Sequence, residues 1–178
     1  IIKPVLKGAD IKRYSIRRPQ NWIIFTRRGT DIDQYPGVRE YLTRFKQKLT
    51  PGIGRKKGTY KWFEIQDNTA FYKKFEEKKI VWPRLSNINS FAISEHREFT
   101  LDSSSFAIYD KPEYLCGILN SKVILFYFKI GAVIWGKEGM KWFGEYFDSL
   151  PIPQGDSFTI NKVGDLVTQI TRLKKLNS

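Results

Sequence analysis

The sequence has few of the residue types from which most catalytic and metal centres are built. Its 178 residues include one cysteine, Cys116, and one histidine, His96. A zinc cluster and a disulfide framework need more of these residues, and a cysteine–histidine pair would need an accessible thiol, which Cys116 within an apolar run is not expected to provide, so these kinds of site are excluded. We expect His96 to lie in an exposed turn, outside any serine triad, and Cys116 to be a buried hydrophobic residue, in keeping with a reducing cytoplasm.

Low-complexity segments, internal repeats and a signal peptide are also missing from the sequence. A hydrophobic content of 41% and an aromatic content of 15% are typical of a folded protein, and the length suits a single domain. The chain begins at Ile1 without a methionine. We therefore expect it to be part of a longer polypeptide, in which another domain performs the chemistry.

Acidic residues are scarce in the first third of the chain. Residues 1–63 hold sixteen lysines and arginines against four aspartates and glutamates, whereas the remainder holds fifteen against fourteen. The net charge of +13 is therefore concentrated in a segment that also contains several aromatic residues. This pattern favours a nucleic-acid partner over a merely solubilising surface.

The basic first third contains a strand, a helix and a glycine-rich loop by its sequence pattern. Residues 21–26 are rich in aromatic and β-branched residues, which predicts a strand. Residues 36–49 have apolar residues at helical spacing, which predicts an amphipathic helix. Residues 50–62 hold three glycines around Arg55-Lys56-Lys57 without a nucleotide-binding spacing. We interpret them as a mobile basic loop that orders against DNA, with a plain surface loop as the alternative.

The middle of the chain predicts a short helix over 69–77 followed by a β-meander around 79–109, in which Pro83 marks the end of a strand. Acidic residues precede a lysine here, as Asp67 with Glu76-x-Lys78 or with Glu77-x-Lys79. This spacing resembles one used by magnesium-dependent nucleases, although such charges also arise by chance. A nuclease is therefore an alternative function.

An apolar stretch over residues 114–135 has four interpretations: a membrane span, one buried helix, a buried strand, or two short helices. Lys122 and Lys129 disfavour a span, because each unpaired charge in hydrocarbon costs about 3 kcal/mol. An unbroken helix would place Lys122 within its apolar face. We predict helices over 112–119 and 122–130 with Ser121 as the cap of the second, whose apolar stripe is Val123, Phe126 and Ile130.

These elements predict an α+β protein with a single domain. Its mixed or mainly antiparallel sheet is packed by helices at about 36–49, 69–77, 112–119, 122–130 and 162–175, the last capped by Asn161. We expect residues 1–153 to form a nucleic-acid-binding domain and residues 154–178 to form a helical extension packed on it.

Several local patterns, taken in order, resemble one known family. They are Lys3-Pro4-Val5-Leu6-Lys7-Gly8-Ala9-Asp10-Ile11-Lys12-Arg13-Tyr14, Trp22 with its strand, Tyr35-Pro36 with Leu42 and Leu49, Trp62-Phe63-Glu64-Ile65, Lys79-Ile80-Val81-Trp82-Pro83, Tyr114-Leu115-Cys116-Gly117-Ile118-Leu119-Asn120-Ser121 and Leu150-Pro151-Ile152-Pro153. Over about 150 residues they are similar to the TaqI-like C-terminal specificity domain of adenine-specific DNA methyltransferases and fused restriction-modification enzymes.

The resemblance implies that catalysis and DNA sequence selection are carried out by two different domains of one polypeptide. An amino-terminal domain would bind S-adenosylmethionine and methylate an adenine flipped out of duplex DNA, with endonuclease activity of the parent protein left open. The present sequence contains no Asn-Pro-Pro-Tyr motif. We therefore expect this chain to choose the DNA sequence, with no cofactor, metal or catalytic residue of its own and no membrane contact.

Candidate DNA-binding residues follow from the basic segments. We expect mainly phosphate contacts from Lys7, Lys12, Arg13, Arg17, Arg18, Arg27, Arg28 and Lys61. We expect base reading from the loop, with Arg55 forking onto guanine, Lys56 and Lys57 in either role, and Tyr60 at its edge. Arg84 and Arg97, near strand ends, are lesser candidates.

Two other functions stay open beside the nuclease. A single-strand or RNA-binding module would use Trp22, Tyr60 and Trp62 to stack bases. A purely structural spacer would bind no nucleic acid. For most of the tryptophans, packing in the core is the simpler expectation.

Overall fold

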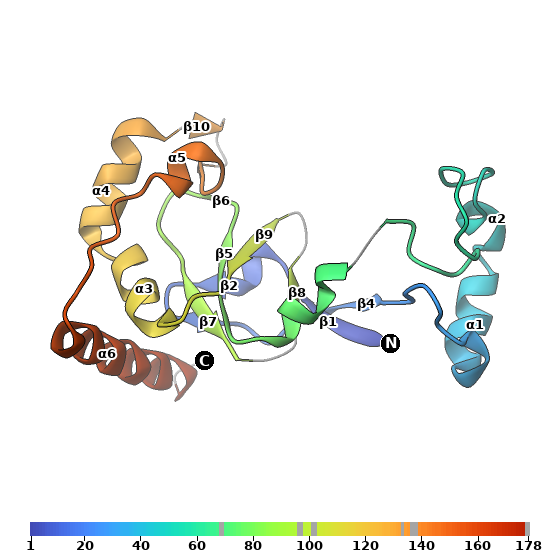
Figure 1. Cartoon of the computed structure of the whole chain (residues 1–178), viewed down its shortest axis with the longest axis horizontal. Coiled ribbons are helices and arrows are strands. Elements are labelled where there is room, and N and C mark those ends of the chain that lie inside the picture. The colour runs from blue at the N-terminus through green and yellow to red at the C-terminus, as the bar shows by residue number, and fades with distance from the viewer. Residues whose placement is uncertain (68–69, 96–97, 101–102, 133, 136–138, 177–178) are drawn as a thin grey trace. The chain divides into compact units, whose positions relative to one another are not determined.

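The computed structural model describes residues 1–178 except 68–69, 96–97, 101–102, 133, 136–138 and 177–178. In chain order the strands and helices are β1 (Ile2–Leu6), η1 (Gly8–Asp10), β2 (Ile11–Lys12), β3 (Ser15–Ile16), β4 (Asn21–Ile24), η2 (Ile32–Gln34), α1 (Pro36–Thr43), α2 (Lys46–Leu49), η3 (Ala70–Glu76), β5 (Lys79–Pro83), β6 (Leu85–Ser86), β7 (Ala92–Ser94), β8 (Phe99–Thr100), β9 (Ser104–Ala107), α3 (Pro112–Leu119), α4 (Lys122–Gly131), β10 (Ile134–Trp135), β11 (Gly139–Lys141), α5 (Glu145–Asp148) and α6 (Ser157–Leu176). Figure 1 labels most of them.

The chain forms two compact units. Residues 1–3 and 22–72 make the first, called here the insert unit, and residues 4–21 and 73–178 make the second, called here the core unit. The last helix belongs to the same unit as α3, α4 and α5.

The sheets of the core unit are small and mostly antiparallel. β5 is the central strand of a three-stranded sheet, with β7 and β9 antiparallel on its two sides. Every residue of β5 is buried, and Pro83 is its last residue, as predicted. The predicted meander over 79–109 is only partly correct, because β8 leaves this sheet to pair in parallel with β1 and β6 pairs with β11. Together with the helices, these sheets confirm the α+β class.

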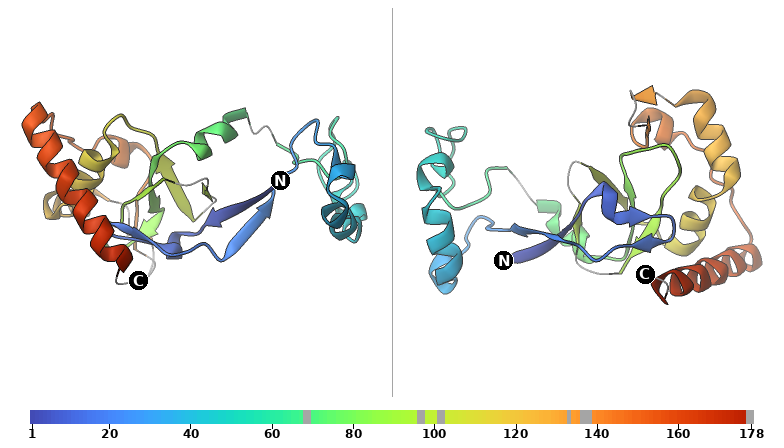
Figure 2. Two further views of the ribbon diagram at one scale, coloured as in Figure 1. Left: turned by 90° about the horizontal axis from the view of Figure 1, so that it is seen from below. Right: turned by 180° about the vertical axis from the view of Figure 1, so that it is seen from behind.

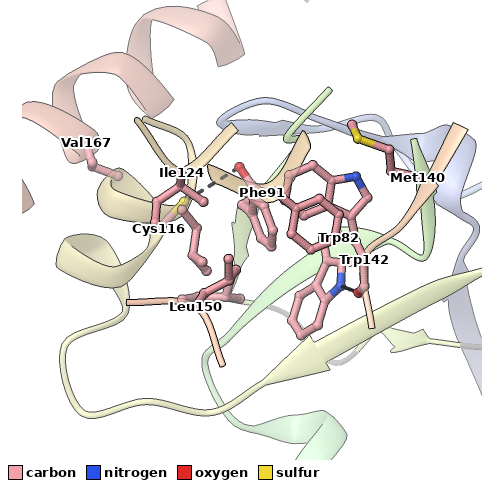
Figure 3. Close-up of a cluster of buried hydrophobic side chains, with 11 residues drawn as sticks. Trp82, Phe91, Cys116, Ile124, Met140, Trp142, Leu150 and Val167 are labelled. Carbon is pink, nitrogen blue, oxygen red and sulfur yellow. Dashed lines mark hydrogen bonds between the residues drawn. The ribbon is translucent and has the colours of Figure 1, made fainter. Parts of the chain in front are cut away.

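The main hydrophobic cluster is aromatic (Figure 3). The rings of Phe128 and Trp142 stack with centroids 3.9 Å apart, and Phe91 meets Trp142 edge to face. The indole nitrogen of Trp82 donates to the main-chain oxygen of Trp142 over 2.7 Å. Cys116 lies in this cluster, and burial raises the pKa of its thiol to about 12. Two of the five tryptophans, Trp82 and Trp142, are therefore core residues of this cluster.

The apolar stretch over 114–135 contains two helices, as predicted. α3 ends at Leu119, and α4 begins at Lys122 after a 60° bend. The Ser121 hydroxyl accepts a hydrogen bond from the main-chain nitrogen of Ile124 over 3.1 Å. This N-cap satisfies a nitrogen that an unbroken helix would have bonded internally.

Among the described residues, no helix is by itself long and apolar enough to span a bilayer. α3 and α4 pass that test only when they are taken together across their bend.

The face that α4 buries differs from the predicted one. Ile124 and Phe128 point into the core, whereas Val123, Phe126 and Ile130 are each more than two-thirds exposed. Both sets recur at helical spacing, so periodicity alone could not say which one is covered.

The last helix begins earlier than predicted. α6 starts at Ser157, and the carboxylate of Asp156 accepts a hydrogen bond from the main-chain nitrogen of Thr159 over 2.7 Å. Asp156 therefore has the capping role assigned to Asn161, which lies inside the helix. Val167 is buried and Val163 half-buried, in keeping with the contact between α6 and α3.

The helix predicted over 36–49 is interrupted in the insert unit. α1 ends at Thr43, whose hydroxyl donates to the main-chain oxygen of Arg39 over 2.7 Å, and α2 begins at Lys46. A threonine that bonds back to the preceding turn competes with the helical backbone. The predicted apolar stripe of this helix is not buried. α1 buries no residue, and Tyr41 and Phe45 remain exposed, with their ring centroids 5.4 Å apart.

Replacing Ser121 with alanine tests the bend between α3 and α4. Loss of the cap should lower the free energy of unfolding by about 1 kcal/mol, measured by chemical denaturation. Ser157→Ala, at the first residue of the Asp156-capped helix α6, is the matched control and should have a smaller effect. Equal stability of the two variants would contradict the capping role.

Candidate nucleic-acid interface

A short hairpin presents the basic N-terminal segment of the core unit. β2 and β3 pair antiparallel with Lys12 opposite Ser15, so the turn consists of Arg13 and Tyr14. Tyr14 has a φ of 62°, a left-handed conformation that a bulky residue adopts only when its surroundings impose it. Ile11 is buried, which leaves Lys12 on the exposed face.

The core holds this turn by two hydrogen bonds. A guanidinium nitrogen of Arg13 donates to the main-chain oxygen of Asn120 over 2.5 Å, at the C-terminal end of α3. The main-chain nitrogen of Tyr14 donates to the main-chain oxygen of Phe91 over 2.9 Å. Burial also raises the pKa of the Tyr14 phenol, against the lowering effect of Arg13. Arg13 is therefore mainly a structural anchor of the hairpin.

A basic groove of about 1070 Å³ runs beside the hairpin. Its cationic lining consists of Lys12, Arg17 and Arg18 from the N-terminal segment and Lys174 from α6. The carboxylate in its lining is that of Asp10, and Ile16, Ile170 and Leu173 provide apolar surface. Figure 2 shows the C-terminal end of α6 beside this segment, in agreement with the contact between α6 and β3. The groove can therefore hold an extended polyanion.

Of the three remaining predicted cations of the core unit, Lys7 and Arg84 lie outside this groove. Lys7 is exposed, and its main-chain nitrogen donates to the Asp10 carboxylate over 2.8 Å. The guanidinium of Arg84 lies 4.1 Å from the ring centroid of Phe143 and is half-buried. Arg97 is outside the described residues.

In the insert unit, Arg55 braces the loop that carries it. Its Nε, Nη1 and Nη2 donate to the main-chain oxygens of Leu49, Glu64 and Trp62, over 2.7, 2.8 and 2.8 Å. Three of the five N–H groups of its guanidinium are so engaged, which disfavours a bidentate fork onto a guanine edge. The base-reading role predicted for Arg55 therefore gains no support from these contacts, and the loop expected to be mobile has an internal brace.

Tyr60 and Arg28 belong to the same brace. Tyr60 is buried, and the guanidinium groups of Arg28 and Arg55 lie 4.8 and 4.7 Å from its ring centroid. Arg28 also donates to the main-chain oxygens of Ile65 and Gln66. Burial removes Tyr60 from the predicted stacking surface, and these bonds make Arg28 a weaker phosphate candidate.

Buried Glu64 ties further parts of the insert unit together. Its two carboxylate oxygens accept from the main-chain nitrogens of Gly29, over 3.0 Å, and Lys61, over 2.8 Å. Glu64 belongs to the Trp62-Phe63-Glu64-Ile65 block. Through Glu64, this block links the turn at Gly29 to the loop at Lys61.

The other predicted cations of the insert unit are exposed, and they differ in the contacts that they make. Lys56 forms an ion pair with Asp67, which lowers the pKa of that carboxyl, and Arg27 lies 4.1 Å from the ring centroid of Tyr72. The ammonium of Lys61 lies 5.7 Å from the ring of Phe63. Lys57 is exposed at the loop's edge.

The acid–lysine pattern of the nuclease hypothesis is used for other contacts. Lys78 forms ion pairs with Glu113 and Glu95, at 2.5 and 3.4 Å. Lys79 is fully buried, and its ammonium donates to the main-chain oxygen of Phe75 and to the Ser94 hydroxyl. Burial lowers the pKa of Lys79, opposed by the carboxylate of Glu98. Within the described part of the chain, no three acidic, histidine or cysteine side chains gather as metal ligands.

The structure thus sorts the predicted residues into two sets. Arg13, Arg28, Arg55 and Tyr60 hold the fold, whereas Lys12, Arg17 and Arg18 meet in one groove. Sequence reasoning missed Lys174. The signal was the basic last turn of the final helix, where Lys174 and Lys175 follow the apolar stripe.

Comparison with known proteins identifies one family. The model of the TaqI-like C-terminal specificity domain matches residues 3–152. No curated protein sequence matches the chain. Because the match covers most of the 178 residues, the chain belongs to the family of TaqI-like C-terminal specificity domains.

Proposed function

We propose that this chain recognises a specific sequence in double-stranded DNA for an adenine-specific methyltransferase or a fused restriction-modification enzyme of the cytoplasm. The observation that carries the proposal is the basic groove of the core unit, in which four cations face one carboxylate. A duplex presents a regular array of phosphates, and lysine and arginine side chains neutralise them with release of counterions. Family membership supports the same role.

The reaction would belong to another domain of the parent polypeptide. That domain would lie amino-terminal to this chain, bind S-adenosylmethionine and methylate an adenine flipped out of the duplex. The part of this chain would be to position the duplex and select its sequence.

Phosphate contacts and base contacts would come from different residues. Lys12, Arg17 and Arg18 line the groove and would set the register on the backbone. In the insert unit, Lys57 and Lys61 are exposed and remain suited to phosphates or guanine edges. Of the predicted loop residues, Lys57 takes over the base-reading role first assigned to Arg55.

A single-strand module has less support than a duplex binder. Trp22 is 63% exposed, but Trp62 is half-buried with its ring edge-on to Phe63, and Tyr60 is buried. Of the three rings predicted to stack bases, Trp22 alone is exposed, and one ring does not make the row of stacking surfaces that unpaired bases need.

Duplex binding should weaken steeply with salt. Each neutralised phosphate contributes about −0.9 to the slope of log affinity against log salt concentration. The double variant Arg17→Ala/Arg18→Ala should therefore reduce the magnitude of the slope by about 2 and weaken binding in 0.1 M salt between tenfold and a hundredfold. Fluorescence anisotropy with a labelled duplex measures both quantities.

The control for this titration is Lys122→Ala/Lys129→Ala, which removes the same net charge from the exposed part of α4. It should retain nearly the wild-type slope. A wild-type slope near zero, or equal losses in the two double variants, would reject phosphate binding by the groove.

Arg55→Lys tests whether Arg55 supports the loop. The charge is kept but the three-way donation is lost, so the insert unit should lose about 2 to 3 kcal/mol of local stability. Hydrogen exchange of residues 50–66 should accelerate while that of α3 is unchanged. Arg44→Lys, at an exposed arginine paired only with Glu40, is the matched control. Unchanged exchange together with an altered preferred DNA sequence would restore Arg55 as a base reader.

A further inference from the structure

We propose that the last turns of α6 form one wall of the DNA-backbone site, with Lys174 as a phosphate ligand. This inference rests on the proposed function and assigns a role to a segment outside the family match, which ends at residue 152. Lys174 lines the same groove as Lys12, Arg17 and Arg18, although more than 150 residues separate it from them in the chain.

The groove has the surface of a backbone site. Its cations come from both the N-terminal segment and α6, and the apolar side chains of Ile16, Ile170 and Leu173 belong to the same lining. A sugar–phosphate backbone offers the same combination, because charged phosphates alternate with deoxyribose rings. Leu173 is 59% exposed, so its apolar side chain presents surface to a ligand in the groove.

A glycine inside the family match sets the position of α6. A Cβ atom added to Gly117 of α3 would lie 2.8 Å from Cγ1 of Val163 and 3.0 Å from Cγ2 of Val167. Both valines are β-branched, and Val167 is buried. Gly117 thus permits α3 and α6 to approach closely, and this approach brings the C-terminal turns of α6 to the hairpin.

Residues 15–18 line two neighbouring cavities, and the charges in their linings decide which one suits a polyanion. A second cavity of about 360 Å³ is lined by Arg17, Arg18 and Lys175, but also by Glu95 and Glu98. Carboxylates there would repel a phosphate. The larger groove, with Asp10 as its carboxylate, is the favourable path for the strand.

The test compares two lysines of one helix in the full chain. Lys174→Ala should weaken binding of a random-sequence duplex about eightfold in 0.1 M salt and reduce the salt slope by about 0.9. Lys162→Ala removes the same charge near the other end of α6, beside Phe158, and should leave both quantities unchanged. A second pair, Leu173→Glu and Leu166→Glu, places a carboxylate inside and outside the groove; only the first should weaken binding.

The outcomes separate this inference from the proposed function. If the wild-type chain binds no duplex, the proposed function fails. If it binds duplex but Lys174→Ala and Leu173→Glu behave as their controls do, the α6 wall is rejected while duplex binding stands. If Lys174→Ala weakens binding of poly-glutamate but not of duplex, the groove serves an acidic protein partner, which also overturns the inference.

Discussion

The buried amide of Asn120 holds the core unit together at the corner between α3 and α4. It donates to the main-chain oxygen of Phe91 over 2.8 Å and accepts from the main-chain nitrogen of Phe91 over 3.1 Å, and so imitates a strand partner. The Asn89 amide donates to the main-chain oxygens of Leu119 and Ser121 on either side of it. Because Phe91 also anchors Tyr14, this pairing fixes the basic hairpin to the helical corner.

The basic residues of the chain divide between building the fold and facing solvent. Arg13 and Arg55 direct their guanidinium nitrogens at main-chain oxygens, where they act as fixed donors to the end of a helix and to a loop. Lys12, Arg17 and Arg18 instead line an open groove. The number of basic residues is therefore only an upper bound on the number of phosphate contacts, because some of their side chains form hydrogen bonds within the protein.

Patterns of local origin were predictable from the sequence. Lys122 in an apolar run required a break, and the break occurs at Ser121; Pro83 ends its strand. What depends on distant partners was not predictable. The loop sequence around Arg55 contains no sign that its guanidinium bonds to Leu49 and Glu64, and the period of α4 fits two faces equally well.

The residues of the groove were likewise only partly predictable from the sequence. The concentration of charge in the first third pointed to Lys12, Arg17 and Arg18, but their meeting with Lys174 depends on how α6 packs on Gly117. No pattern along the chain records that approach, because both partners are ordinary residues of their own helices.

The most direct measurement is mass-spectrometric footprinting of lysine and arginine side chains in the intact chain, with and without a bound duplex. The account predicts that the duplex protects Lys12, Arg17, Arg18 and Lys174 from modification and leaves Lys122 and Lys129 unchanged. Equal modification of the groove residues in the free and the DNA-bound protein would contradict it.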